Sequence, residues 1–287
     1  MGPRGVSSDR LPTTILFAAT DTPRTRDTME GEMADQGKGD LSDLGGSAWV
    51  GFESALFQMG SDSGRDDARP VHGVRLSGFR FSRYPVTNAQ YAEFVSATGR
   101  AAPEHWPGGE VPAELADHPV TYVSWDDAQA FCGWLTGTVG AGDDNAATGG
   151  AHLPTEAQWE FAARGVEGRD YPWGDDPPTP ERANYQESAT EDTTPVDTHS
   201  HGATPDGIYD LAGNVRQWCL DWYSHYEDTS QEDPSGPEEG RERVLRGGSY
   251  LDAPGTLQGA YRFNVAPDSR FGFVGFHVAW SSLGGNS

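Results

Sequence analysis

Glycine and proline interrupt this chain too often for it to contain many long helices or strands. Its 287 residues include 37 glycines and 20 prolines, and both residue types mark turns and break regular structure. An aromatic share of 11%, with 9 tryptophans, still provides for a sizeable hydrophobic core. We therefore predict an α+β domain with short elements and little regular secondary structure, rather than a helical bundle.

Three short helices carry recognisable start signals. In a capping box, a Ser or Thr side chain and a partner three residues later bond each other's backbone N–H groups. Apolar residues at helical spacing after such a pair complete the signal. The three starts are expected at Thr87 or Asn88, at Ser124 with Asp127, and at Thr155 with Gln158.

The chain divides into a leader and one domain. Residues 1–47 are polar and have no apolar periodicity, so we predict a disordered leader there. Strands are then predicted at 55–59, 71–76 and 79–84, from short apolar runs bounded by turn residues. Because composition does not change again, residues 48–282 are predicted to form a single domain.

The charge balance restricts the possible partners. Acidic residues outnumber basic ones by 44 to 20, and the formal net charge is −24. Such a chain repels nucleic acids and anionic membranes, so neither is an expected partner. The apolar run at 15–19 is too short to cross a bilayer and lacks signal-peptide features, so we expect a monomeric cytoplasmic protein. Two origins of the acidity stay open, a GC-rich genome and adaptation to high salt.

A series of motifs in a fixed order indicates a family. The most specific are Leu-Pro-Thr-Glu at 153–156, Gly-Asn-Val-Arg-Gln-Trp at 213–218, Arg-Gly-Gly-Ser-Tyr at 246–250, then Arg262 and Gly-Phe-His at 275–277. They resemble the core of the formylglycine-generating-enzyme, or sulfatase-modifying factor, family. This resemblance implies a single irregular C-type-lectin-like domain, in agreement with the glycine and proline content.

The best-known chemistry of that family needs residues that this chain lacks. Family oxidases convert a substrate cysteine to formylglycine with copper held by a cysteine pair, whereas this chain has Asp252 and Leu257 at those positions. Copper(I) prefers soft thiolates, and Cys132 and Cys219 lie in apolar settings typical of core residues. We therefore expect no copper site, and interpret the chain as a non-catalytic binding or accessory protein.

Two alternatives stay open. One is a diverged metal-dependent oxidase of the same family that acts on a Cys or Tyr side chain. The other is a ligand-binding protein of the variable type diversified by retroelements. An iron-dependent sulfoxide synthase is not favoured, because the histidines are scattered. At five further positions this chain departs from the family's usual Arg, Trp or Glu, which indicates a rebuilt internal polar network. These positions are His152, Arg216, Gln217, Gln258 and His277.

The resemblance also implies structural calcium, which oxygen ligands in a loop-rich fold suit well. If calcium is absent, the same side chains only cap turns. The first implied site comprises Asp210, Gly213, Val215 and Gln217, where Gln217 replaces a carboxylate. The second comprises Asn184 and Tyr185, with Asp192 as a possible further ligand.

A mixed aromatic and polar segment follows the Gly-Gly-Ser motif. In lectin-like members of the family this region forms the ligand surface, and its composition here suits protein or peptide recognition. We predict a ligand-binding surface made of Ser249, Tyr250, Asp252, Gln258, Arg262, Phe263, Asn264, Arg270 and Phe271.

Overall fold

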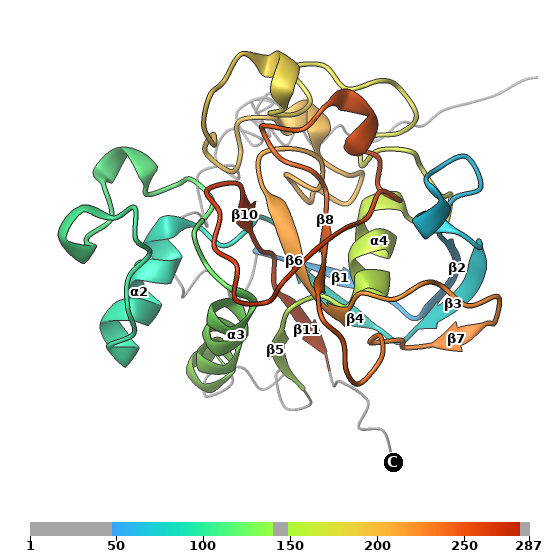
Figure 1. Cartoon of the computed structure of the whole chain (residues 1–287), viewed down its shortest axis with the longest axis horizontal. Coiled ribbons are helices and arrows are strands. Elements are labelled where there is room, and N and C mark those ends of the chain that lie inside the picture. The colour runs from blue at the N-terminus through green and yellow to red at the C-terminus, as the bar shows by residue number, and fades with distance from the viewer. Residues whose placement is uncertain (1–47, 140–148, 282–287) are drawn as a thin grey trace, which may run out of the picture. The chain divides into compact units, whose positions relative to one another are not determined.

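The computed structural model describes residues 48–139 and 149–281, so the predicted leader lies outside it. Short helices and short strands are joined by long irregular loops (Figure 1). The helices are α2 (Asn88–Thr98), α3 (Trp125–Val139) and α4 (Glu156–Arg164). This arrangement confirms the predicted α+β class.

The strands of the described residues form three small sheets. The first has the order β1 (Trp49–Phe52), β4 (Phe79–Ser82), β11 (Ala279–Ser281) and β5 (Gly150–His152). The second has the order β10 (Val274–Gly275), β6 (Arg216–Trp222), β8 (Arg243–Arg246) and β9 (Phe263–Val265). The third has the order β2 (Ala55–Met59), β3 (His72–Leu76) and β7 (Gln231–Glu232). Strand β11 pairs antiparallel with both β4 and β5, which ties the last described strand to earlier parts of the chain.

The helix starts form as the sequence predicts. Thr87 and Thr155 each accept a hydrogen bond from the N–H of the glutamine three residues on, and that glutamine bonds back to the N–H of its cap. At α3 the Ser124 N–H donates to the Asp127 carboxylate at 3.0 Å, and the Asp127 N–H donates to Ser124 Oγ at 3.2 Å. These contacts satisfy N–H groups that an uncapped helix would leave without partners.

The predicted strands agree with β2 fully and with β3 and β4 in their central parts. Strand β3 begins one residue later than predicted, and β4 ends two residues earlier, at Ser82. The Ser82 Oγ donates to the carbonyl of Tyr84 at 2.9 Å, which turns the chain toward α2. No helix among the described residues is both long and apolar enough to span a membrane.

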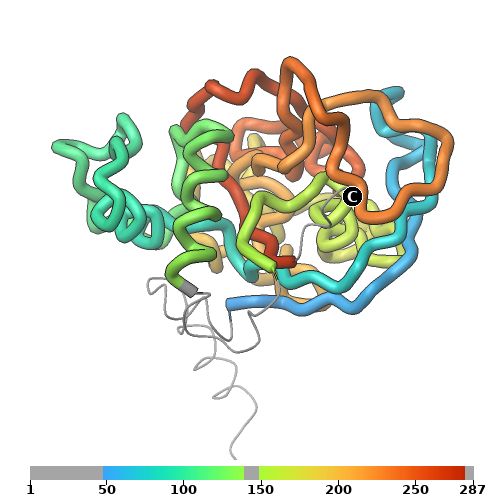
Figure 2. The backbone as a smooth tube through the Cα atoms, turned by 90° about the horizontal axis from the view of Figure 1, so that it is seen from below, coloured from blue at the N-terminus to red at the C-terminus, as the bar shows by residue number. Residues whose placement is uncertain are grey.

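Two hydrophobic clusters hold these elements together. One joins α2 and α3 through residues such as Phe94, Phe131 and Phe276. The other packs α4 against β2, β3 and β4 through residues such as Phe81 and Trp159. Figures 1 and 2 both place α2 beside α3, with β2 and β3 on the far side of the second sheet. The second sheet therefore lies between the two clusters and carries the end of β6 where the candidate site begins.

Candidate functional site

Asp252, at the first of the two positions where family oxidases carry cysteine, is bound in an ion pair. The Arg216 guanidinium donates from Nε to Asp252 Oδ2 at 2.9 Å and from Nη2 to Oδ1 at 2.6 Å. The Ser249 hydroxyl adds a hydrogen bond of 2.7 Å to Oδ2. Only 10% of the Asp252 side chain stays exposed. The carboxylate is thus occupied by a two-point contact of the strong kind.

Leu257, at the second position, lies in the core. The Gly-Gly pair before Ser249 makes room for it: Gly248 has a φ of +73°, and a Cβ there would come within 2.5 Å of Leu257 Cδ2. The leucine is fully buried in a small cluster with Tyr171, Ala183, Tyr185 and Ala212. The side chain at this position therefore supports packing and offers no ligand atom.

The two cysteines are in no better position to hold copper. Cys132 belongs to the cluster of α2 and α3, and Cys219 belongs to the cluster around α4. Both thiols are free and buried, and burial raises the pKa of each. Because copper(I) binds thiolates, neither cysteine lies in a setting that favours its binding form.

Aromatic rings gather around Arg216 and form what we call the aromatic face, defined as Arg216, Phe263, Phe271 and Phe273. The guanidinium carbon lies 4.0 Å from the ring centroid of Phe263 and 5.3 Å from that of Phe273. Phe271 stacks on Phe273 with ring centroids 5.0 Å apart. Phe271 is 37% exposed, and the other two rings are half-buried. The face is therefore accessible and held by cation–π and stacking contacts.

Tyr122 extends this face, and sequence reasoning missed it. Its N–H donates to the carbonyl of Phe271 at 3.0 Å, and its ring lies 4.9 Å from that of His105. Residue 122 adopts a left-handed backbone with a φ of +56°, an uncommon conformation for a tyrosine. Only contacts across the fold bring Tyr122 and Phe271 together, so no local pattern could have indicated it.

The predicted ligand-binding surface needs correction at three positions. Ser249 is fully buried, Asp252 is 8% exposed and Arg262 is 2% exposed, so none of the three presents its side chain on a surface. The cause is that all three make internal polar contacts with distant or buried partners. The other predicted positions are exposed or half-buried, namely Tyr250, Gln258, Phe263, Asn264, Arg270 and Phe271.

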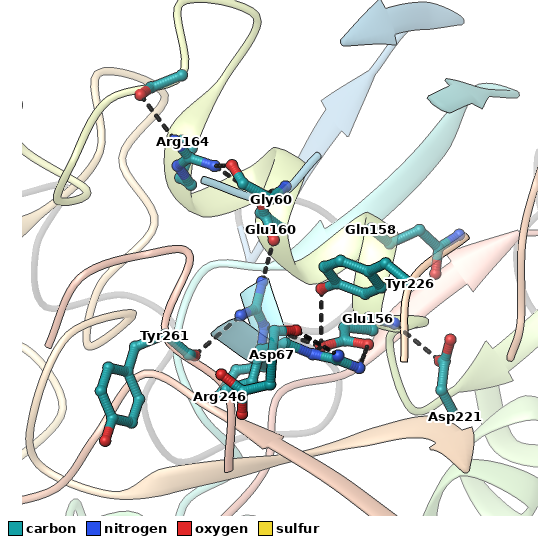
Figure 3. A network of polar contacts seen from close by, with 12 residues as sticks. Gly60, Asp67, Glu156, Gln158, Glu160, Arg164, Asp221, Tyr226, Arg246 and Tyr261 are labelled. Atoms are coloured by element: carbon teal, nitrogen blue, oxygen red, sulfur yellow. Dashed lines mark hydrogen bonds and ion pairs between the residues drawn. The ribbon is translucent and has the colours of Figure 1, made fainter. Parts of the chain in front are cut away.

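Arg262 belongs instead to a buried ionic network around α4, of which Figure 3 labels Glu156, Glu160 and Arg246. It donates to Glu156 from Nε at 2.6 Å and from Nη2 at 2.7 Å. Arg246 contacts Glu160, which also accepts from Arg164. Burial alone would raise the pKa of Glu156, but Arg262 and Arg246 outweigh it and hold that pKa below its usual value. Arg246 and Arg262 of the motif series thus serve the interior of the fold.

The residues of the two implied calcium sites meet through Asn214. Its amide donates to Asp210 Oδ2 at 3.1 Å and its Oδ1 accepts from Asn184 Nδ2 at 3.3 Å. Asp210 and Asn214 both have positive φ, which fits a tight loop. Asn184 also donates to the carbonyl of Asp192 at 2.9 Å, so the substitute that the sequence indicated lies at the second site.

Two observations fit a hard cation in this loop. Asn184 Oδ1 is buried with no hydrogen-bond partner among the described residues, and an orphaned oxygen of this kind suits calcium. Burial raises the pKa of Asp210 to about 8, and the nearby negative charge of Asp197 adds to the rise, so a cation here would stabilise the carboxylate. Gln217 fits less well, since its Oε1 already accepts from Trp159 at 2.6 Å and its amide donates to the Asp210 carbonyl.

This combination of short capped helices, small sheets and a loop-built site defines a C-type-lectin-like domain of the formylglycine-generating-enzyme type. Residues 45–282 match the "Sulfatase-modifying factor enzyme 1-like domain". The chain therefore belongs to the sulfatase-modifying factor family.

Three similar proteins illustrate the range of this family. The formylglycine-generating enzyme of Streptomyces coelicolor is 34% identical, over 78% of this chain and 86% of that protein. The serine/threonine-protein kinase Pkn1 of Chlamydia trachomatis is 35% identical over 79% of this chain, which spans only 37% of that relative. The solved structure of Treponema denticola variable protein 1 superposes with a TM-score of 0.67 and 27% identity, covering 80% of this chain and 94% of that one.

Proposed function

We propose that this chain is a non-catalytic binding or accessory member of the family. One observation carries the proposal: both positions of the copper-binding cysteine pair are committed to the fold. Asp252 is held by Arg216 and Ser249, and Leu257 is a core residue. A copper site at this place would need two thiolates, and the chain provides a paired carboxylate and an aliphatic side chain.

The ligand that we propose is a protein or peptide segment, bound at the aromatic face. Phe271 and Phe273 offer a stacked pair of rings, and Arg216 offers a planar cation whose carboxylate partner is already in place. Rigid aromatic rings and arginine are the groups that anchor protein interfaces. We expect the protein to act as a cytoplasmic monomer, with calcium as a structural ion in the loop around Asn184 and Asp210.

The binding part of the proposal is tested by selecting a displayed random-peptide library on the purified protein. Peptides that bind wild-type protein should lose at least about tenfold in affinity to the variant Phe271→Ala, because an anchoring ring contributes on that order. Glu114→Ala, an exposed side chain on another part of the chain, is the matched control. Selected peptides that bind the Phe271→Ala variant as tightly as wild type would refute the assignment of the face.

The non-catalytic part is tested with copper(I), oxygen and a cysteine-containing sulfatase peptide. We expect no aldehyde product, whereas the copper chemistry of the family oxidases would give one. Aldehyde formation by wild-type protein would overturn the proposal, whatever the outcome of the peptide selection.

A further inference from the structure

A concave site that shares no residue with the aromatic face lies beside α4 and the loop that follows β6. It is a cavity of about 510 Å³, within the usual size range of small-ligand pockets. Asp221 and Glu156 line its inner wall, while Glu227, Glu232 and Asp233 come from the loop and β7. Glu156 and Arg262 of the motif series line this cavity, but the proposed function does not involve it, and we call it the acidic pocket.

The charges of the acidic pocket do not balance. Glu156 is neutralised by its bidentate contact with Arg262. No arginine or lysine of the described residues forms an ion pair with Asp221, Glu227, Glu232 or Asp233; Arg75 lies opposite Glu232 only in the backbone register of β3 and β7. Four carboxylates without an ion-pair partner thus line a concave surface together with Arg262, whose charge is matched by Glu156, and the net negative charge of such a surface attracts cations.

Asp221 is the most informative of these groups. It is 5% exposed and lies in the pocket wall. Its carboxylate accepts one hydrogen bond, from the N–H of Glu156 at 2.8 Å, as Figure 3 shows. A buried carboxylate without a cation is costly unless something pairs with it. Burial and the neighbouring Glu156 raise its pKa to about 7, so the folded chain itself leaves this charge poorly compensated.

The remaining walls suit an organic cation better than a metal ion. Within residues 48–139 and 149–281, no three His, Cys, Asp or Glu side chains converge as a metal would require. Instead, the pocket wall includes the rings of His72, Trp222 and Tyr226, and His72 packs on Tyr226 at 4.9 Å. Arg243 already covers one face of Trp222 and Arg262 one face of Tyr226, so the rings of the wall are suited to packing against the apolar stem of an organic cation.

We propose that the acidic pocket binds an alkyl guanidinium or alkylammonium group, with Asp221 as its buried partner and the loop carboxylates at its mouth. Such a group is carried by small amines and by the arginine or lysine side chain of a peptide. The proposal is independent of the aromatic face, so either can fail alone.

Calorimetric titration with butylguanidine tests this, with pentanamide, an uncharged amide that has the same butyl stem, as the ligand control. The titration is run at about pH 8, where the carboxylates are ionised. Butylguanidine should bind and pentanamide should not. Asp221→Asn should weaken binding about tenfold or more, since it removes a charge-assisted hydrogen bond. Asp206→Asn, an exposed change of the same charge, should leave the affinity unchanged.

If Asp221→Asn does not fold, the double variant Glu227→Gln/Glu232→Gln decides, because both side chains are exposed. The double variant should weaken binding of butylguanidine roughly several-fold, because it removes two exposed charges near the ligand. A capped Gly-Arg-Gly peptide that binds more tightly than butylguanidine assigns the pocket to a peptide side chain, and a weaker one assigns it to a free amine or guanidine. Equal binding of pentanamide, or unchanged affinity in the folded variants, would overturn the proposal.

Discussion

The Arg216–Asp252 pair provides the sharpest prediction, because it stands at the position of a missing ligand. In the structure, two hydrogen bonds of 2.9 and 2.6 Å join the two side chains. The side chain of Arg216 is 25% exposed and that of Asp252 is 10% exposed, so solvent screens the pair only in part. The perturbation is a double-mutant cycle of Arg216→Met and Asp252→Asn.

The expected magnitudes follow from these contacts. Hydrogen bonds to charged groups contribute about 1.5–3 kcal/mol, and the cation–π contact with Phe263 adds about 0.5–1 kcal/mol. Arg216→Met should therefore lower the free energy of unfolding by about 3 kcal/mol. Asp252→Asn should cost about 2 kcal/mol, because Ser249 still donates to the amide oxygen. The coupling free energy of the pair should be about 1.5 kcal/mol.

Urea unfolding of the four proteins, followed by tryptophan fluorescence, measures this coupling. The exposed pair Arg270–Asp127, with N···O of 2.6 Å and side chains 46% and 23% exposed, is the matched control. Its coupling should stay below about 0.5 kcal/mol, because exposed pairs contribute little. A coupling for Arg216–Asp252 no larger than the control would refute the view that Asp252 is committed to an internal contact.

Three further outcomes are expected. Glu160→Gln should lower the free energy of unfolding by about 3–5 kcal/mol, since it removes the buried carboxylate that Arg246 and Arg164 both contact; a loss below about 1 kcal/mol in urea unfolding would contradict this. Millimolar calcium should raise Tm in wild type, and Asn184→Ala should abolish the rise; an equal rise in both proteins would exclude Asn184 as a ligand. The folded-state pKa of Asp221, about 7, lies above its ordinary value of 3.8, so the folded chain holds a proton there that the unfolded chain has released. The contribution of Asp221 to the free energy of unfolding therefore falls as pH rises from about 4 to about 7, by on the order of 4 kcal/mol. Urea unfolding of Asp221→Asn should lack this dependence of the free energy of unfolding on pH.

The parts of the fold that could be predicted from the sequence are those set by local contacts. The capping boxes at Thr87, Ser124 and Thr155 involve residues three positions apart, and all three helices begin where these pairs indicate. The family motifs then supplied the fold class, which short-range patterns alone could not.

The site residues that were misplaced depend on long-range contacts. Arg262 pairs with Glu156, which is 106 positions earlier in the chain, so its burial could not be predicted from its neighbours in the sequence. Likewise, the charge of Asp221 and its place in a pocket depend on the loop that covers it, where a Cβ at Gly236 would lie 2.9 Å from Asp221. Alternating aromatic and polar residues indicated a surface, but not which side chains turn inward.

One departure from the family pattern shows how the interior adapts. His277, which stands where an arginine is usual, is fully buried, and its Nδ1 lies 3.0 Å from Ser82 Oγ. Burial lowers its pKa to about 3, so the ring is neutral at ordinary pH. A neutral ring packed against Phe81 needs no carboxylate partner, whereas an arginine there would.

The most direct test of the central claim is a copper(I) competition titration of the purified protein against a chromogenic chelator under anaerobic conditions. We predict that the chelator keeps all of the copper, because Asp252 and Leu257 provide no thiolate and both cysteines are buried. Retention of one equivalent of copper by the protein, lost in the variant Asp252→Asn, would contradict the account, since it would make Asp252 a ligand rather than the partner of Arg216.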